Sequence, residues 1–415
     1  MLESVRRDLL ATDRELLMPA QRRAQGLVPV SVDEVAPLDR NRAVALIRLA
    51  DDRVMVVPIA RDGGMWRRAV AGDQVSTAVL SASAPFGVEL LAEVPTCDSS
   101  VERVLTADMS NELVVVDEVL AVKWQLFAEQ GHLAGPRLTS HLFRVGFDQT
   151  PAPIAVVTWN ERLIASATRF LPDAVDGWEW MVDHVVAYAT GDAEVPTWPS
   201  DVGALVARFH RACATPSEVI ANPVVTSESL APWVDHYRHL LTRIHTLDDE
   251  MQSALKPWLP RFTHAIAQLS QAHNVVAIPL HGDLHAGQLL RWSGGLAVSD
   301  FDGNPLLPAE YRADPGPAAF DLACILRSVD HVAQVVAKRA RELNRLAAAD
   351  IALDWSIAAR RELRSEYVRA VEPRLCAAEL IDVFESLSPL HEAVYAATYL
   401  PRWRYVPLGV LSRGW

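Results

Sequence analysis

A short stretch near residue 290 limits how this chain can fold more than any other part of the sequence. Two apolar runs, residues 289–290 and 296–298, flank a Ser-Gly-Gly segment, which is typical of a hairpin with a glycine-containing turn. Because a hairpin folds the chain back on itself, the residues just before it and just after it must lie close together. The sequence therefore predicts that Gln288 and Asp300 are neighbours.

Another carboxylate, Asp283, precedes this hairpin. One small volume would then hold a carboxylate before the hairpin, the amide of Gln288 at its start and the carboxylate of Asp300 at its end. Phosphoryl transfer on a kinase-like scaffold needs such a set, because one carboxylate accepts the proton of a substrate hydroxyl while an amide and a carboxylate hold a metal on the nucleotide phosphates. Oxygen ligands suit Mg²⁺, which is a hard cation.

The segments that carry this set are His-Gly-Asp-Leu-His-Ala-Gly-Gln at residues 281–288 and Asp-Phe-Asp-Gly at residues 300–303. They resemble the catalytic loop and metal-binding segment of the aminoglycoside phosphotransferase-like kinases, and within them the maltokinase-like glucosamine kinases of actinobacteria. The resemblance implies an α+β, protein-kinase-like bilobal fold with an N-terminal β-rich cap domain, and ATP and Mg²⁺ as cofactors. It implies Asp283 as the catalytic base, and Gln288 and Asp300 as magnesium ligands.

The same loop has other interpretations. His281, Asp283 and His285 alternate, so they could present three zinc ligands on one side of a strand. Gly-Asp-Leu-His also resembles the first metal motif of metallophosphoesterases, but the further motifs of that class are missing from residues 303–415. A loop without chemistry is a third possibility. In the kinase interpretation, His281, His285 and Asp321, which stands near the start of an apolar helix, support the loop structurally.

We expect three domains. Residues 1–92 form the cap domain, in which residues 43–49 and 53–59 read as a hairpin and residues 76–80 as a further strand. Residues 93–196 form a nucleotide-binding lobe, and residues 197–415 a mainly helical lobe with the catalytic loop and the acceptor site.

The nucleotide-binding lobe offers four candidate contacts. Lys123 follows a β-branched residue in an expected strand, from which a lysine can reach nucleotide phosphates as a point charge. Ser110 stands in a polar loop that could cover the phosphates, although this loop lacks glycines. Arg169 and Leu171 lie where the resemblance places a hinge that contacts adenine through its backbone. The alternative for Lys123 is that it is a surface lysine at the end of a strand and contacts no phosphate.

The sequence indicates the reaction better than the acceptor. Trp403 and Tyr405 interrupt the helical pattern near the C-terminus and could stack on a sugar, although a helix-packing tail explains them as well. A cationic amino sugar needs a carboxylate partner, because a buried ammonium without one is costly. Asp302, Asp314 and Glu310 are the candidates.

Departures from the maltokinase pattern favour an amino sugar. Asp302 stands where maltokinases usually carry glutamate, and Asn-Pro at residues 304–305 replaces their Glu-Pro. We therefore expect phosphorylation of glucosamine at its 6-hydroxyl, with maltose kinase and aminoglycoside phosphotransferase as alternatives. A pseudokinase that senses sugar is the non-enzymatic alternative, and it predicts the loss of Asp283, Gln288 or Asp300, all of which are present.

Charge and cysteine content narrow the partners. A net charge of −13 disfavours nucleic acid and anionic membranes as partners. Four widely spaced cysteines indicate free thiols in a reducing compartment. The N-terminal residues lack the apolar core of a signal peptide, and no apolar run approaches the ~20 residues that span a bilayer. We expect a cytoplasmic monomer or homodimer that binds ATP and a sugar.

Overall fold

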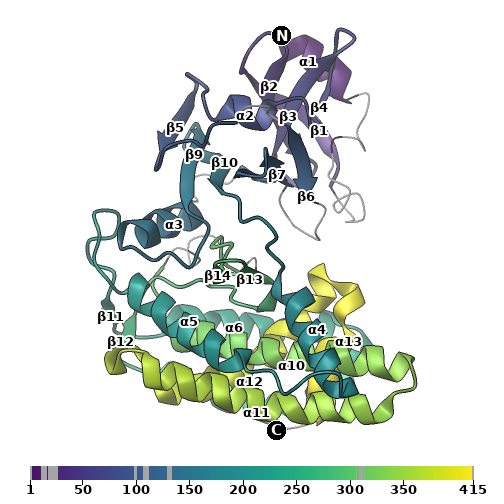
Figure 1. Ribbon diagram of the computed structural model, residues 1–415, viewed down its shortest axis with the longest axis vertical. Coiled ribbons are helices and arrows are strands. Elements are labelled where there is room, and N and C mark those ends of the chain that lie inside the picture. The colour runs from purple at the N-terminus through teal and green to yellow at the C-terminus, as the bar shows by residue number, and fades with distance from the viewer. Residues whose placement is uncertain are drawn as a thin grey trace. The chain divides into compact units, whose positions relative to one another are not determined.

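The computed structural model describes residues 2–10, 16, 27–97, 101–105, 112–128, 133–304, 306, 307, 312 and 314–413. The chain separates into two compact units, shown in Figure 1. The first comprises residues Met1–Pro136 and Pro151–Pro172, and the second comprises Arg137–Thr150 and Asp173–Trp415. In the described part of the chain, no helix is long and apolar enough to cross a membrane.

The first unit begins with a four-stranded antiparallel sheet on which helix α1 (Leu2–Leu10) packs. Its strands, in spatial order, are β1 (Pro29–Pro37), β2 (Arg42–Leu49), β3 (Val54–Asp62) and β4 (Met65–Arg68). Successive side chains of β2 point to opposite faces, so that Val44 and Leu46 enter one core while Ala45 and Ile47 enter another. The predicted hairpin is confirmed, because β2 pairs with β3 over residues 42–48 and 54–60.

The expected strand at residues 76–80 is wrong, because this segment belongs to helix α2 (Val75–Val79). Val75 and Val79 are both buried, and their separation by one helical turn places them on the same face. A five-residue helix is too short for its periodicity to be recognised in the sequence.

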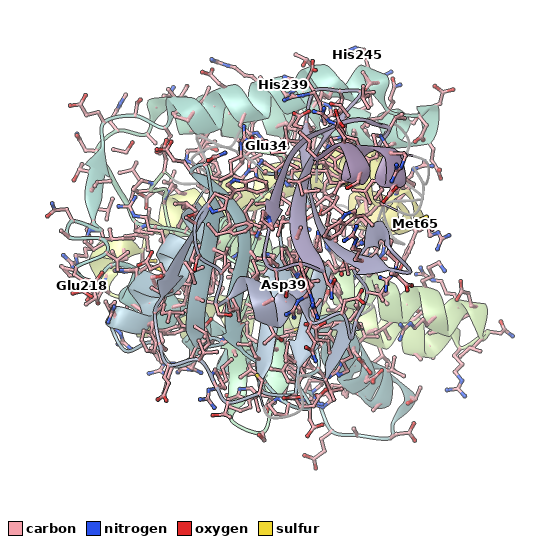
Figure 2. All side chains as sticks on the ribbon, turned by 90° about the horizontal axis from the view of Figure 1, so that it is seen from above. Glu34, Asp39, Met65, Glu218, His239 and His245 are labelled. Carbon is pink, nitrogen blue, oxygen red and sulfur yellow. The ribbon has the colours of Figure 1, made fainter. Side chains whose placement is uncertain are left out.

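A six-stranded antiparallel sheet completes the first unit, in the order β5-β9-β10-β8-β7-β6. Its strands are β5 (Phe86–Leu90), β6 (Glu102–Leu105), β7 (Glu112–Val116), β8 (Leu120–Trp124), β9 (Pro153–Trp159) and β10 (Arg162–Arg169). Strand β5 lies in the region assigned to the cap domain, yet it pairs with β9. Asn160 and Glu161 turn the chain between β9 and β10 with positive φ angles of 51° and 61°. Asn160 also donates to Glu34 of β1 at 3.0 Å, and Glu34 is labelled in Figure 2.

The second unit is mainly helical and contains two short antiparallel sheets of two strands each, β11 (Val225–Ser227) with β12 (Val275–Ala277), and β13 (Leu289–Trp292) with β14 (Gly295–Val298). Its helices are α3 (Ala134–Arg144), which begins in the first unit, α4 (Gly177–Thr190), α5 (Trp198–Cys213), α6 (Ala231–Arg243), α7 (Asp249–Leu255), α8 (Leu259–Gln271), α10 (Ala319–Glu342), α11 (Leu346–Ala370), α12 (Ala378–Tyr399) and α13 (Tyr405–Arg413).

Helix α5 has a proline in its first turn. Thr197 is the N-cap residue, and Pro199 follows two residues later. Proline is favoured there because the first N–H groups of a helix need no partner within it.

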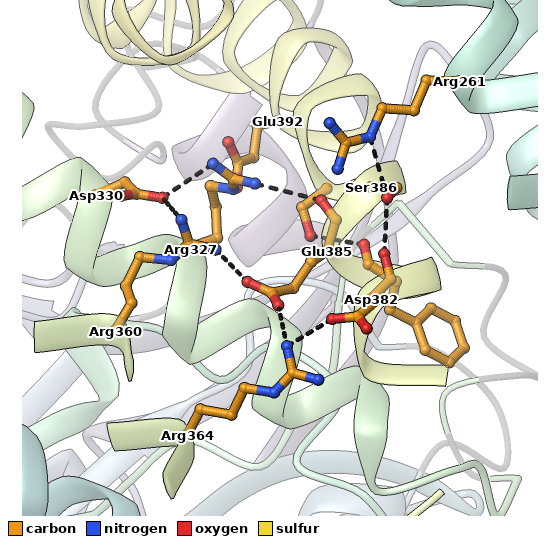
Figure 3. Close-up of polar contacts among 11 residues, drawn as sticks. Arg261, Arg327, Asp330, Arg360, Arg364, Asp382, Glu385, Ser386 and Glu392 are labelled. Carbon is orange, nitrogen blue, oxygen red and sulfur yellow. Dashed lines mark hydrogen bonds and ion pairs between the residues drawn. The ribbon is translucent and has the colours of Figure 1, made fainter. Parts of the chain in front are cut away.

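Ion pairs join the three longest helices of this unit, as Figure 3 shows. Asp330 of α10 accepts from Arg327 of the same helix at 2.9 Å and lies 3.2 Å from Arg360 of α11. Arg360 also pairs with Glu385 of α12, next to an Arg364–Asp382 pair at 2.5 Å. Helix α10 is thereby held between α11 and α12, and it is the helix that carries the support for the catalytic loop.

Candidate active site

Asp321 anchors the start of the catalytic loop. Its side chain, in the first turn of α10, is fully buried. One carboxylate oxygen accepts from the backbone N–H of His281 at 2.8 Å, and the other accepts from that of Gly282 at 2.9 Å. His210 of α5 lies 3.3 Å away on another side. These charge-assisted hydrogen bonds fix the direction in which the loop leaves β12.

His281 is occupied on both ring nitrogens. Nε2 lies 2.9 Å from the carbonyl oxygen of Ser299, and Nδ1 accepts from the backbone N–H of Asp283 at 3.3 Å. Burial lowers the pKa of this imidazole, which is therefore neutral and donates through Nε2. A zinc ion needs a lone pair that neither nitrogen can supply, so the alternating His-Asp-His pattern does not form the metal site considered above.

The end of the loop packs tightly against two helices. The N–H of Gly287 donates to Nδ1 of His285 at 3.0 Å, and that of Ala286 donates to the hydroxyl of Ser328 on α10 at 2.7 Å. A Cβ atom on Gly177, the first residue of α4, would collide with the carbonyl oxygen of Ala286. Glycine at this position therefore lets α4 begin directly against the loop.

The predicted hairpin brings the two ends of its strands together. Residues 289–292 of β13 pair with residues 295–298 of β14, and the N–H of Ser299 donates to the carbonyl of Gln288 at 2.9 Å. Asp300 follows with a φ of 63°, a left-handed conformation that is uncommon outside glycine and often found at functional sites. The chain thus turns sharply at the carboxylate that the sequence assigned to metal binding.

Asp283 lies in an environment that favours its protonated form. Burial, followed by the neighbouring carboxylates of Asp300 and Asp321, raises its pKa to about 8. One contact acts in the opposite direction, because the amide of Asn304 donates to Oδ1 of Asp283 at 3.1 Å. The sequence analysis used Asn304 only as a departure from the maltokinase pattern and did not predict its contact with Asp283, although its place directly after the Asp-Phe-Asp-Gly segment was the available signal.

The donors in this region suit Mg²⁺ by their chemistry. Gln288 supplies an amide and Asp300 a carboxylate, and the clustered negative charge that raises the pKa of Asp283 is what a cation would neutralise. Within the described ranges, no three His, Cys, Asp or Glu side chains come together as a metal-binding group. A cation at this site would therefore be held by the amide of Gln288 together with the carboxylate of Asp300, and not by three side chains of those types.

Aromatic rings adjoin the catalytic loop. Trp403 and Tyr405 stack with ring centroids 6.3 Å apart, and Trp403 contacts Trp178 of α4 at 5.1 Å. Trp178 in turn lies 6.1 Å from the ring of His285. His331 of α10 also stacks on Trp178. Neither His331 nor Trp178 was predicted from the sequence as a sugar contact.

The acidic candidates for an amino sugar differ in exposure. Asp302 is partly buried and lies two residues after Asp300, whereas Asp314 is exposed. Glu310 lies outside the described residues.

The candidates for nucleotide binding belong to the first unit. Lys123 is partly buried on β8, with Leu113 of β7 and Ser166 of β10 as its neighbours in register. Arg169 ends β10 with an exposed side chain, and Leu171, two residues later, is buried. Ser110 lies outside the described residues.

Comparisons with known proteins give relatives along almost the whole chain, although no protein-family model matches it. A glucosamine kinase from Streptacidiphilus jiangxiensis is 35% identical over 427 aligned positions, which cover 96% of this chain and 94% of the relative. A glucosamine kinase from Mycolicibacterium smegmatis (strain ATCC 700084 / mc(2)155) is 34% identical over 375 positions, covering 85% and 90%.

A solved structure of a glucosamine kinase in complex with glucosamine, ADP and inorganic phosphate superposes with a TM-score of 0.73. It is 30% identical to this chain and covers 99% of it, with 98% of its own length matched. The predicted fold, an α+β kinase fold with a β-rich N-terminal region, is confirmed by this likeness.

Proposed function

The chain belongs to the glucosamine kinase family, and from this membership we propose that it transfers the terminal phosphoryl group of ATP to a hydroxyl of glucosamine. The observation that carries the proposal for the catalytic centre is the position of Asp283. It stands on a loop anchored by Asp321, beside the hairpin that joins Gln288 to Asp300. A carboxylate held in this way can act as a general base without reorganising during the reaction.

In the proposed reaction, Asp283 accepts the proton of the sugar hydroxyl. The hydroxyl oxygen then forms a bond to the terminal phosphorus of ATP, and the bond from that phosphorus to the bridging oxygen breaks, which leaves ADP. The base must be ionised to accept a proton, so the raised pKa of Asp283 would have to fall when positive charge enters the site.

We propose that Gln288 and Asp300 hold Mg²⁺ through their side-chain oxygen atoms. When bound, this cation would offset the negative charge of the phosphates and of the reacting groups. The left-handed backbone of Asp300 supports the assignment, because such conformations cluster at sites where a side chain must point in one direction.

For the nucleotide we propose Lys123 as a phosphate contact, with Ser110, Arg169 and Leu171 as further contacts. Support for Lys123 comes from its strand, since β8 lies inside the six-stranded sheet and holds the lysine stem between two neighbours. A lysine fixed at its stem presents its ammonium group as a point charge.

For the acceptor we propose glucosamine bound against Trp403 and Tyr405, with phosphorylation of its 6-hydroxyl. The chain of ring contacts from Trp403 through Trp178 to His285 supports this, because aromatic faces stack on the C–H surfaces of sugars. Asp302 and Asp314 are the proposed carboxylates for the amino group. Of the two, the partly buried Asp302 offers the stronger interaction, because a pair at the surface is screened by water.

An ADP-release assay with ATP and Mg²⁺ tests the proposal across glucosamine, N-acetylglucosamine, glucose, maltose and kanamycin. We expect turnover on glucosamine, and ³¹P NMR of the product would identify the hydroxyl. Turnover on maltose or kanamycin alone would support one of the alternative kinases, and silence on every acceptor would support the sugar sensor.

We further propose that the protein works in a reducing cytoplasm as a monomer or homodimer. None of the four cysteines, all of which lie in the described part of the chain, forms a disulfide, and the buried thiol of Cys213 has a pKa raised by burial, which makes it unreactive. Size-exclusion chromatography with light scattering would distinguish the two oligomeric states.

A further inference from the structure

Asn304 holds a central position among the groups that surround the proposed base. Its side chain is 3% exposed. Its amide nitrogen donates to Oδ1 of Asp283 at 3.1 Å and lies 2.9 Å from Nε2 of His391 on α12. Its amide oxygen accepts the backbone N–H of Leu306 at 2.8 Å. These three contacts fix the orientation of the amide, because its oxygen accepts one hydrogen bond while its nitrogen donates two.

The backbone around Asn304 also brings it to the loop. Gly282 and Gly303 both have positive φ, at 79° and 76°. A Cβ atom on Gly282 would lie 3.3 Å from the Cα of Gly303, so the two chain segments nearly touch there. The N–H of Leu307 closes a turn by donating to the carbonyl of Asn304 at 3.0 Å. This turn is therefore built against the residue that precedes Asp283.

From these contacts we infer that Asn304 is a positioning residue that fixes the rotamer of Asp283 and leaves Oδ2 as the proton-accepting oxygen. The inference rests on the proposed function. Oδ1 is committed to the Asn304 amide, whereas Oδ2 lies 4.0 Å from Nε2 of His285. Because Oδ1 is held by this hydrogen bond, the carboxylate cannot rotate away from the substrate. Misplacement of a catalytic group by about 1 Å can lower a rate by about 100-fold.

His391 would hold the amide of Asn304 in turn. Burial lowers the pKa of His391 to about 3, so its imidazole stays neutral and Nε2 keeps the lone pair that accepts from Asn304. Nδ1 of His391 is buried and has no hydrogen-bond partner within the part of the chain that the structure describes. The contact with Asn304 is thus the polar interaction that orients this ring.

Two substitutions of Asn304 test the inference. Asn304→Ala removes the donor, and Asn304→Asp keeps the shape but replaces the donor with a carboxylate that cannot donate when ionised. We expect kcat with glucosamine to fall by about 10- to 100-fold for each, while KM for ATP changes by less than about threefold. Asn222→Ala is the matched control, since Asn222 is exposed in the same unit.

Substitutions of His391 provide a second test if an Asn304 variant fails to fold, which thermal unfolding would reveal. His391→Ala removes the acceptor and should lower kcat, whereas His391→Gln offers an amide oxygen in its place and should restore most of the loss. A merely structural histidine would lower the melting temperature without this difference between the two variants.

The outcomes separate the inference from the proposed function. If the wild type turns glucosamine over and the Asn304 variants retain kcat within about twofold, Asn304 does not position the base. If the wild type turns over no acceptor, the proposed function fails and takes this inference with it. A selective loss of kcat in both Asn304 variants would establish the role.

Discussion

The carboxylate of Asp321, at the start of α10, accepts the backbone N–H of His281 at 2.8 Å. This contact crosses from a helix to the catalytic loop, and the second oxygen of the same carboxylate holds the next N–H. The geometry of the loop is therefore set by a residue that cannot reach the substrate from its buried position. The stability of the fold and the placement of the loop that carries the proposed base both depend on this side chain.

Asp321→Asn should lower both the stability of the fold and the rate of the reaction. An amide has one acceptor fewer than a carboxylate, and hydrogen bonds to a charged group contribute about 1.5–3 kcal/mol each. We expect urea denaturation to give a free energy of unfolding lower by about 2 kcal/mol or more, together with a reduced kcat. Asp350→Asn, at an exposed aspartate of α11, is the control. An unchanged free energy of unfolding would contradict the anchoring role.

Asp283→Asn should remove the base. General-base catalysis contributes about 10²- to 10⁴-fold, so kcat in the ADP-release assay should fall by that range. Binding of ATP, measured by calorimetry, should persist, because the substitution keeps the size of the side chain. Activity within about tenfold of the wild type would remove Asp283 from the mechanism.

The same substitution should stabilise the protein at alkaline pH. Asp283 has a pKa of about 8 in the folded protein, above the ordinary value of an unfolded aspartate. Its contribution to stability is therefore fully present below the unfolded pKa and is lost as the pH rises through about 8. The variant carries no titrating group at this position, so its advantage in melting temperature over the wild type should grow with pH.

The other titratable groups around Asp283 do not reverse the expected loss of stability with rising pH. Asp300 and Asp321 raise its pKa by their negative charge, and the imidazole pKa values of His281 and His285 are lowered by burial, which keeps these rings neutral at alkaline pH. Tyr395 has a pKa raised by burial and then by Asp283 itself. A difference in melting temperature that stays constant between about pH 6 and about pH 9 would show that Asp283 does not titrate in this range.

Local patterns in the sequence predicted much of the site. The turn chemistry of residues 289–298 was enough to place the ends of that hairpin together, and the apolar runs at residues 43–49 and 53–59 predicted the pairing of β2 with β3. These features depend on neighbours in the chain, which a reader of the sequence can see. Helix α2 was missed because a single turn of helix has too few residues to show a period.

Contacts between distant segments could not be predicted in this way. Asn304 reaches Asp283 where Gly282 and Gly303 let their chain segments approach, it reaches His391 on α12, and Ser328 of α10 meets Ala286. No spacing in the sequence encodes such a meeting. Strand β5 illustrates the same limit, because it joins β9 across a long separation while its own sequence shows only an ordinary strand.

Glu385→Gln should destabilise the second unit. Its side chain is 10% exposed and pairs with Arg360, in the group of residues shown in Figure 3. Removing one member of a buried pair leaves its partner with an uncompensated charge, which costs about 3–5 kcal/mol in well-buried cases. Because Asp330 remains near Arg360, we expect a smaller loss of about 1–3 kcal/mol in urea denaturation.

Asp382→Asn on the same helix is the matched control, since that side chain is 69% exposed and its pair with Arg364 should contribute little. Equal effects of the two substitutions would contradict this distinction.

Lys123→Ala should act on the nucleotide and leave the sugar unaffected. An ammonium group that contacts phosphate oxygens contributes to the binding of ATP, so its loss should raise KM for ATP by about tenfold or more. KM for glucosamine should stay within about twofold, because Lys123 belongs to the first compact unit whereas the residues proposed for the sugar belong to the second. Lys123→Arg keeps the charge but spreads it over a planar group, so it should recover only part of the lost affinity.

Initial rates measured at varied ATP and saturating glucosamine, then at varied glucosamine and saturating ATP, give KM for ATP and KM for glucosamine separately. If Lys123→Ala leaves KM for ATP unchanged, the lysine is an ordinary residue of a strand and the phosphates are held by other groups.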